Sequence, residues 1–241
     1  MAACYWLPLL VIHVLLARSL VSSDPQDPAR LIKFKTSLNN TFELSNWDLN
    51  IPPCAYESPN WKGMICNRDG SVLGLVLENM GLSGMIDVDT LAEITSIRTL
   101  SFMNNSFEGS IPDLRKIVPL RGIFLSFNKF SGEIGSDVFI GMSYLRTVEL
   151  ANNNFRGKIP ISLTQLPLLT KLKLQNNQFE GEIPDLEQKN LLEANFANNG
   201  LVGPIPKGLS NQDPSSFAGN NLCDKPLSPC KKKVNKKNDV A

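Results

Sequence analysis

The hydrophobic positions between residues 72 and 210 follow one pattern that occurs six times. Each copy has two apolar residues two positions apart, usually an Asn three residues later, and then an apolar residue, a Gly and an Ile, often followed by Pro. The first apolar positions lie 25, 23, 25, 24 and 22 residues apart. Self-similarity at such a fixed spacing is the signature of a solenoid. These first positions are Leu75, Leu100, Ile123, Val148, Leu172 and Ala194.

Each part of the pattern predicts a local structure. The apolar pair indicates a short strand with both side chains facing inward, and successive strands stack in parallel to bury a common face. The Asn is expected to turn inward and bond to loop backbone, while Gly permits a sharp turn and Ile-Pro begins an extended convex segment. The period is that of leucine-rich repeats. We therefore predict an α/β leucine-rich-repeat solenoid with six repeats, a curved array and a parallel concave sheet.

Two copies depart from this pattern inside the core. Met80 stands where the first Asn is expected, and Ala194 replaces a larger apolar residue in the sixth copy. The small Ala side chain thins the core there, so we expect the last repeat to depend most on what covers it.

Residues 1–23 are predicted to be a secretory signal peptide. The apolar run from 7 to 17 is too short to span a bilayer, and small residues precede Asp24. The single histidine, His13, and the odd cysteine, Cys4, both lie in this segment. After cleavage, the chain therefore holds four cysteines and lacks histidine.

Different sequences flank the repeats, and we predict that each covers one open end of the array, because terminal units of a solenoid would otherwise expose its core. Residues 24–71 form the predicted N-terminal cap, with a helix beginning at Asp27 and Pro28. Leu31 and Phe34 follow at helical spacing. Residues 211–230 form the predicted C-terminal cap, and residues 231–241 a basic, disordered tail.

The N-terminal cap contains, in chain order, the predicted helix, Trp47, Pro53-Cys54 and Trp61-x-Gly-x-x-Cys66. Repeats with Gly-x-Ile-Pro follow it. This arrangement resembles the extracellular part of plant leucine-rich-repeat receptor-like kinases. The strings at 77–84, 98–105, 111–116 and 213–217 are similar to the pollen receptor-like kinases within that group. The resemblance covers about residues 24 to 230. It implies a receptor ectodomain that binds small secreted, often cysteine-rich peptides with its later repeats and final cap.

The four remaining cysteines indicate disulfide bonds in a secreted chain, and four cysteines allow three pairings. Proximity and the family resemblance favour Cys54 with Cys66 and Cys223 with Cys230, one bond in each cap. A zinc site is disfavoured because the spacing is wrong and histidine is absent after cleavage.

Several function classes are disfavoured by the sequence. Without histidine, a Ser-His-Asp or Cys-His arrangement is excluded, and none of the kinase signatures occurs, so we predict a protein that is not an enzyme and uses no cofactor. After residue 23 there is no run of about twenty apolar residues to span a membrane. Nucleic-acid binding is disfavoured because the folded part is mildly acidic. The tail lysines favour contact with an anionic surface, or a merely solvated tail. They are Lys231, Lys232, Lys233, Lys236 and Lys237.

Residues that flank the inward pair should point outward on the concave face, which is an extended binding surface in solenoids. Phe124 is a large apolar side chain at such a position, and aromatic residues are enriched among interface hot spots. Lys171 and Lys173 form a predicted basic spot beside Glu149 and Glu193 that would orient a charged partner. The resemblance adds Asn195 and the segment 211–216 as candidate contacts.

Asn39 and Asn104 begin Asn-x-Ser/Thr glycosylation sequons. Asn104 is expected near the rim of the concave face, where a glycan would direct binding toward the later repeats.

The function we predict is extracellular binding of a secreted peptide or small protein by a receptor-like-kinase ectodomain in pollen or reproductive signalling, with a co-receptor as a further partner. Two alternatives stay open: a free secreted decoy or co-receptor-like protein, and an inhibitor of a cell-wall enzyme. The chain is either a short secreted product or a fragment of a longer receptor.

Overall fold

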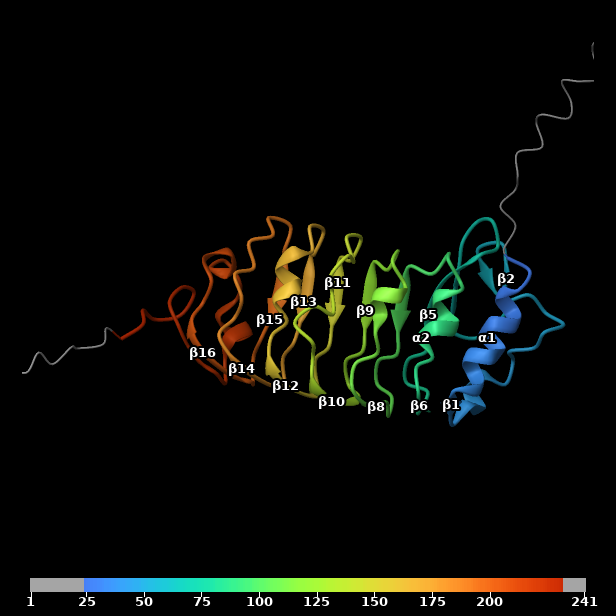
Figure 1. The fold of residues 1–241 in the computed structure, drawn as a ribbon, viewed down its shortest axis with the longest axis horizontal. Coiled ribbons are helices and arrows are strands. Elements are labelled where there is room, and N and C mark those ends of the chain that lie inside the picture. The colour runs from blue at the N-terminus through green and yellow to red at the C-terminus, as the bar shows by residue number, and fades with distance from the viewer. Residues whose placement is uncertain (1–23, 232–241) are drawn as a thin grey trace, which may run out of the picture.

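The computed structural model describes residues 24–231. The predicted signal peptide, 1–23, and residues 232–241 of the predicted tail lie outside this range. Figure 1 shows an elongated stack of coils with one helix at its N-terminal end. The predicted leucine-rich-repeat solenoid is confirmed.

The larger sheet has the order β15-β13-β11-β9-β7-β5-β4. The strands β5 to β15 are those predicted from the apolar pairs, and β4 belongs to the N-terminal cap. From β5 onward the neighbours are parallel, and only β4 is antiparallel to β5. The first apolar positions of successive repeats are direct partners, as in Leu75 opposite Leu100. The strands are β4 (Met64–Cys66), β5 (Val72–Val76), β7 (Thr99–Ser101), β9 (Gly122–Phe124), β11 (Thr147–Glu149), β13 (Lys171–Lys173) and β15 (Glu193–Asn195).

A second sheet runs along the other edge of the array, with the order β17-β16-β14-β12-β10-β8 and parallel pairing. These strands are β8 (Glu108–Gly109), β10 (Lys129–Glu133), β12 (Asn154–Lys158), β14 (Gln178–Gly181), β16 (Gly200–Pro204) and β17 (Asn221–Cys223). The corresponding strand of the first repeat, β6 (Ser83–Gly84), instead pairs with β1 (Leu38–Asn39) of the N-terminal cap. Short helices follow this sheet in several repeats, namely α2 (Val88–Ala92), η2 (Leu114–Lys116), η3 (Ile161–Gln165) and η4 (Lys207–Leu209).

The core between the two sheets is a column of leucine and phenylalanine side chains. Phe102 is fully buried, and Leu125 and Leu174 are each 1% exposed, as the strand periodicity predicts. Phenylalanines from consecutive repeats stack, with ring centroids 6.1 Å apart for Phe130 and Phe155 and 6.3 Å apart for Phe155 and Phe179. Each repeat thus buries its apolar face against its neighbours, which it cannot do alone.

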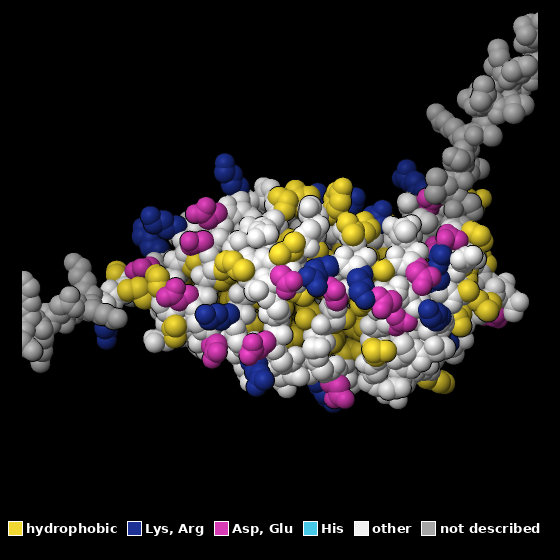
Figure 2. Space-filling view, in the orientation of Figure 1, with side chains coloured by type: hydrophobic (Ala, Val, Ile, Leu, Met, Phe, Trp, Pro, Cys, Tyr) yellow, Lys and Arg dark blue, Asp and Glu magenta, His cyan; other side chains and the backbone are white. Residues whose placement is uncertain are grey.

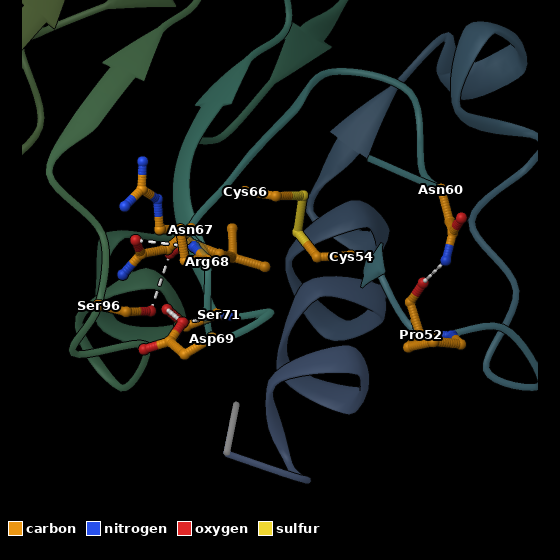
Figure 3. The surroundings of a disulfide bond; sticks show 10 residues. Pro52, Cys54, Asn60, Cys66, Asn67, Arg68, Asp69, Ser71 and Ser96 are labelled. Carbon is orange, nitrogen blue, oxygen red and sulfur yellow. Dashed lines mark hydrogen bonds between the residues drawn. A yellow bond between two sulfur atoms is a disulfide. The ribbon is translucent and has the colours of Figure 1, made fainter. Parts of the chain in front are cut away.

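The N-terminal end of this core is covered by α1 (Asp27–Thr36), followed by η1 (Thr41–Leu44) and the hairpin of β2 (Cys54–Ala55) and β3 (Ser58–Pro59). Phe34 of α1 lies 6.1 Å from the ring of Phe102, and Trp47 stacks on Trp61 at 5.4 Å. The predicted Cys54–Cys66 disulfide is present and joins β2 to β4 (Figure 3).

The C-terminal end is covered by η5 (Pro214–Phe217) and β17. Phe217 stacks on Phe196 of the sixth repeat, with the ring centroids 5.9 Å apart. The second predicted disulfide, Cys223–Cys230, closes this segment. Ala194 of the sixth repeat is fully buried, and its amide is bonded to Gln212 of this cap.

The recurring Asn side chains connect each repeat to the one before it. Asn153 donates through Nδ2 to the carbonyls of Leu150 at 3.2 Å and Leu125 at 3.0 Å, and its Oδ1 accepts from the amide of Phe130 at 3.0 Å. Each of these Asn side chains bonds to the repeat before it. The first repeat has no preceding repeat, which accounts for Met80 in place of Asn there. At the other end Asn220 of the cap donates to the carbonyl of Phe196 at 2.9 Å and continues the series.

Candidate functional site

Phe124 of β9 forms an aromatic platform on the concave sheet. A Cβ atom added to Gly122 would lie 2.6 Å from Cε2 of Phe124. The ring therefore folds back over Gly122 and fits there because glycine has no side chain. Thr99 and Thr147 are the strand partners of Gly122 on either side. The ring is therefore half-buried and lies along the strand, in the middle of the array.

Four charged residues of β11, β13 and β15 form one connected network beside this platform. Lys171 Nζ lies 3.1 Å from Glu193 and 3.7 Å from Glu149, and Lys173 Nζ lies 3.0 Å from Glu193. The predicted basic spot is thus matched by an equal number of carboxylates. The network presents fixed donors and acceptors to a partner and has no net charge.

The ion pairs of the network favour the charged forms of Lys171 and Glu193. Hydrogen bonding to Glu193, opposed by desolvation and aided by the charges of both carboxylates, raises the pKa of Lys171 above its ordinary value. Hydrogen bonds from Lys173 and then Lys171 lower the pKa of Glu193. Lys171 and Glu193 are therefore both charged at neutral pH.

Glu149 is more buried than strand periodicity predicts, with 8% of its surface exposed. Its strand partners are Phe124 on one side and Lys173 on the other, and Lys171 reaches toward its carboxylate. The long side chains of these three neighbours cover Glu149, although it faces outward from the sheet. Glu149 is consequently placed to position Lys171 and offers little surface of its own.

The last concave strand is joined to the C-terminal cap by a residue that the sequence pattern does not single out. Gln212 Oε1 accepts from the amide of Ala194 at 2.9 Å, which satisfies backbone at the end of the sheet. Asn195 is half-buried, and its Oδ1 accepts from the amide of Ala197 at 3.0 Å. Asp213 begins η5 by accepting from the amide of Ser215 at 2.8 Å. The segment 211–216 thus lies directly against β15.

One rim position carries an unusual residue in the third repeat. After each concave strand one residue adopts the left-handed conformation, with φ between 54° and 59°, and it is Asn in five repeats but Phe127 in the third. A bulky residue rarely adopts this conformation. Phe127 is 52% exposed, in the same repeat as Phe124. In the sequence, this difference is visible only as the absence of Asn at position 127. The other positions are Asn79, Asn104, Asn152, Asn176 and Asn198.

Both predicted glycosylation sequons lie on the surface. Asn39 is an exposed residue of β1, and Asn104 is exposed at the rim, where its side chain bonds to that of Asn79. Both side chains are therefore accessible to an enzyme that acts from solvent.

In the part of the chain that the structure describes, no helix combines the length and the apolar composition that a bilayer crossing requires. Residues 24–231 also contain no cluster of three or more His, Cys, Asp or Glu side chains arranged for a metal ion.

Comparison with known proteins agrees with this architecture. The family described as leucine rich repeat N-terminal domain matches residues 24–67, and the family described as leucine rich repeat matches residues 118–179. Pollen receptor-like kinase 4 of Arabidopsis thaliana is 48% identical over 230 residues, which are 91% of this chain and 34% of that protein. The chain thus spans about a third of the length of the curated relatives it matches.

Solved structures show the same fold. The crystal structure of a pollen receptor kinase 3 has 38% sequence identity and a TM-score of 0.76, and the match covers 84% of this chain and 99% of that one. The Arabidopsis receptor kinase HAESA, solved with the peptide hormone IDA and the co-receptor SERK1, has 28% identity and a TM-score of 0.61 over 82% of this chain and 38% of its own. The chain therefore belongs to the leucine-rich-repeat family of plant receptor-like kinases and corresponds to the ectodomain of its pollen members.

Proposed function

We propose that this chain acts outside the cell as the ligand-binding ectodomain of a receptor-like kinase, and that its concave face binds a secreted peptide or small protein in pollen or reproductive signalling. The observation that carries the proposal is the pairing of an aromatic platform, Phe124 over Gly122, with the adjacent charge network of β11 to β15. An apolar anchor beside fixed polar groups is the composition of an interface hot spot.

The comparison with HAESA supports the ligand class, because that relative was solved with a peptide hormone and a co-receptor bound. In our proposal, Phe124 packs against an apolar ligand side chain. Lys171 and Glu193, the more accessible members of the network, exchange hydrogen bonds with the ligand backbone or its charged groups. Lys173 and Glu149 hold them in place, and Asn195 and the segment 211–216 extend the contact toward the cap. A co-receptor is the further partner.

A glycan on Asn104 would restrict this site to the later repeats. The side chain is at the rim next to the second concave strand, so a bulky sugar there covers the early part of the sheet. We expect glycosidase treatment of the secreted chain to reduce its mass and to convert Asn104 to Asp in the glycopeptide. An unmodified Asn104 in that peptide removes this part of the proposal.

The proposal is tested by site-specific cross-linking. A photoreactive phenylalanine analogue at position 124 probes the concave face, and the same analogue at Ile161 of η3, which is 53% exposed, is the matched control. Each variant is incubated with the secreted peptide fraction of pistil tissue, irradiated and analysed by mass spectrometry. We expect one secreted peptide or small protein to be cross-linked from position 124 and not from position 161.

The captured ligand then serves for quantitative binding. We expect Phe124→Ala to weaken it by about thirtyfold, because truncating a hot-spot aromatic costs about 2 kcal/mol. Equal cross-linking from both positions would contradict the proposal. Recovery of a cell-wall hydrolase in place of a peptide would assign the chain to the inhibitor class.

A further inference from the structure

Three arginines occupy adjacent turns on the flank of the array, at the position where the chain enters each concave strand. The amide of Arg121 donates to the carbonyl of Arg98 at 2.7 Å, and the amide of Arg146 donates to the carbonyl of Arg121 at 2.8 Å. These bonds set the three residues in register. Their side chains therefore start about 4.8 Å apart along the axis of the array, which is the spacing of neighbouring strands.

The positive charges of this arginine row are not matched by carboxylates. Between residues 24 and 231, none of Arg98, Arg121 and Arg146 takes part in an ion pair, whereas Lys171 and Lys173 on the concave sheet are both paired. Like charges at neighbouring positions of a sheet destabilise it. The repulsion is relieved when an anion binds across the row.

The row is partly pre-organised, and two of its three members are exposed. Arg98 Nη1 donates to the carbonyls of Thr95 at 2.8 Å and Ile97 at 3.0 Å, which holds that guanidinium against its own loop. Arg121 and Arg146 are exposed. Guanidinium groups present a planar fork of donors that matches a carboxylate better than any other cationic side chain does.

Exposed apolar side chains accompany the row in the same loops. Val118, three residues before Arg121, is 57% exposed, and Tyr144, two residues before Arg146, is 54% exposed. Figure 2 shows hydrophobic side chains gathered along the upper edge of the molecule, over the loops that lead into the strands. The flank thus combines a line of cations with an aromatic ring and an aliphatic surface.

We propose that this flank binds a linear acidic polysaccharide of the polyuronate type, which lies along the axis of the array. A polyuronate has one carboxylate on every sugar, so a single chain lying along the array brings several carboxylates to the arginine row. The C–H faces of the sugars pack on Tyr144 and Val118, and the open flank lets a chain of any length pass.

This site is separate from the concave face and does not depend on the ligand proposed there. The test uses the whole secreted chain and polygalacturonate oligomers as the probe, with fully methyl-esterified oligomers of the same length as the uncharged control. The double variant Arg121→Gln/Arg146→Gln removes the exposed part of the row. Arg156→Gln is the matched variant, because Arg156 is an exposed arginine of β12 on the second sheet.

We expect the acidic oligomers to bind with an affinity that falls as salt rises, and the esterified oligomers not to bind. The double variant weakens binding by about fivefold, which corresponds to about 1 kcal/mol for the two lost ion pairs together. Arg156→Gln and Phe124→Ala change it less than about twofold, and the arginine variants keep the unfolding temperature of the parent chain.

Three results would overturn the proposal. The first is no binding of the acidic oligomers at low salt. The second is equal weakening by Arg156→Gln, which would mean an unspecific charge effect. The third is tighter binding of polyglutamate than of polygalacturonate at equal length, which would assign the arginine row to an acidic protein partner.

Discussion

Removing one inward Asn should weaken the whole array, and Asn153→Ala is the clearest case. Asn153 is 6% exposed, and its side chain is the partner of the buried amide of Phe130. After substitution by Ala that amide lies in the core without an acceptor. An unsatisfied buried donor costs about 1–3 kcal/mol, so this group alone accounts for most of the expected loss.

The carbonyls that Asn153 also contacts are less affected, because neighbouring Asn residues share them. Leu125 O also accepts from Asn128 at 3.1 Å, and Leu150 O also accepts from Asn177 at 2.9 Å. Each therefore loses one of two partners, at about 0.5 kcal/mol apiece. The sum predicts a loss of about 2–4 kcal/mol in the free energy of unfolding.

The assay is equilibrium unfolding in guanidinium chloride with linear extrapolation. Asn154→Ala is the control, since Asn154 is the next residue, has the same chemistry and is exposed on β12. We expect the control to stay within about 0.5 kcal/mol of the parent chain. The reasoning is refuted if Asn153→Ala loses less than about 1 kcal/mol, or no more than the control does.

Three further predictions concern the cap, the rim and the charge network. Replacing Cys223 and Cys230 by Ser should cost about 2.5 kcal/mol for a loop of this length and should speed amide exchange first in β15 to β17; uniform exchange along the chain would contradict it. Phe127→Asn should raise the free energy of unfolding by about 0.5–1 kcal/mol, because it relieves the left-handed backbone of a bulky residue, and any loss would contradict it. Since the folded pKa of Glu193 is lowered, its stabilisation is present above the ordinary pKa and disappears as the pH falls through the folded value. Glu193→Gln should therefore cost under about 1 kcal/mol near pH 7 and less near pH 3, as measured by unfolding at both values; an equal cost at both would exclude the ion pair as its cause.

The sequence predicts the array because its period is both short and redundant. Every repeat contains the same inward-facing apolar pair, so Phe102 and Leu125 could be assigned to the core without reference to any tertiary contact. The local disulfides followed from proximity together with the family resemblance. The pattern also left Met80 as an exception, and only the backward direction of the Asn bonds explains it.

The candidate site was less predictable, because outward direction does not determine accessibility. Phe124 faces outward, but its ring folds over Gly122, a choice of side-chain conformation that periodicity cannot specify. Glu149 also faces outward and is nevertheless covered by neighbours from adjacent strands. The basic spot at Lys171 proved to be a neutral network, because its partners lie 22 residues away in sequence and one strand away in space.

The central claim is that ligand binds on the concave sheet, and amide hydrogen exchange tests it most directly. The chain is measured alone and with the peptide captured from position 124. We predict slower exchange in residues 122–124, 147–149, 171–173 and 193–195 and no change in η3. Protection confined to η3 or to the second sheet, with the concave strands unchanged, would contradict the account.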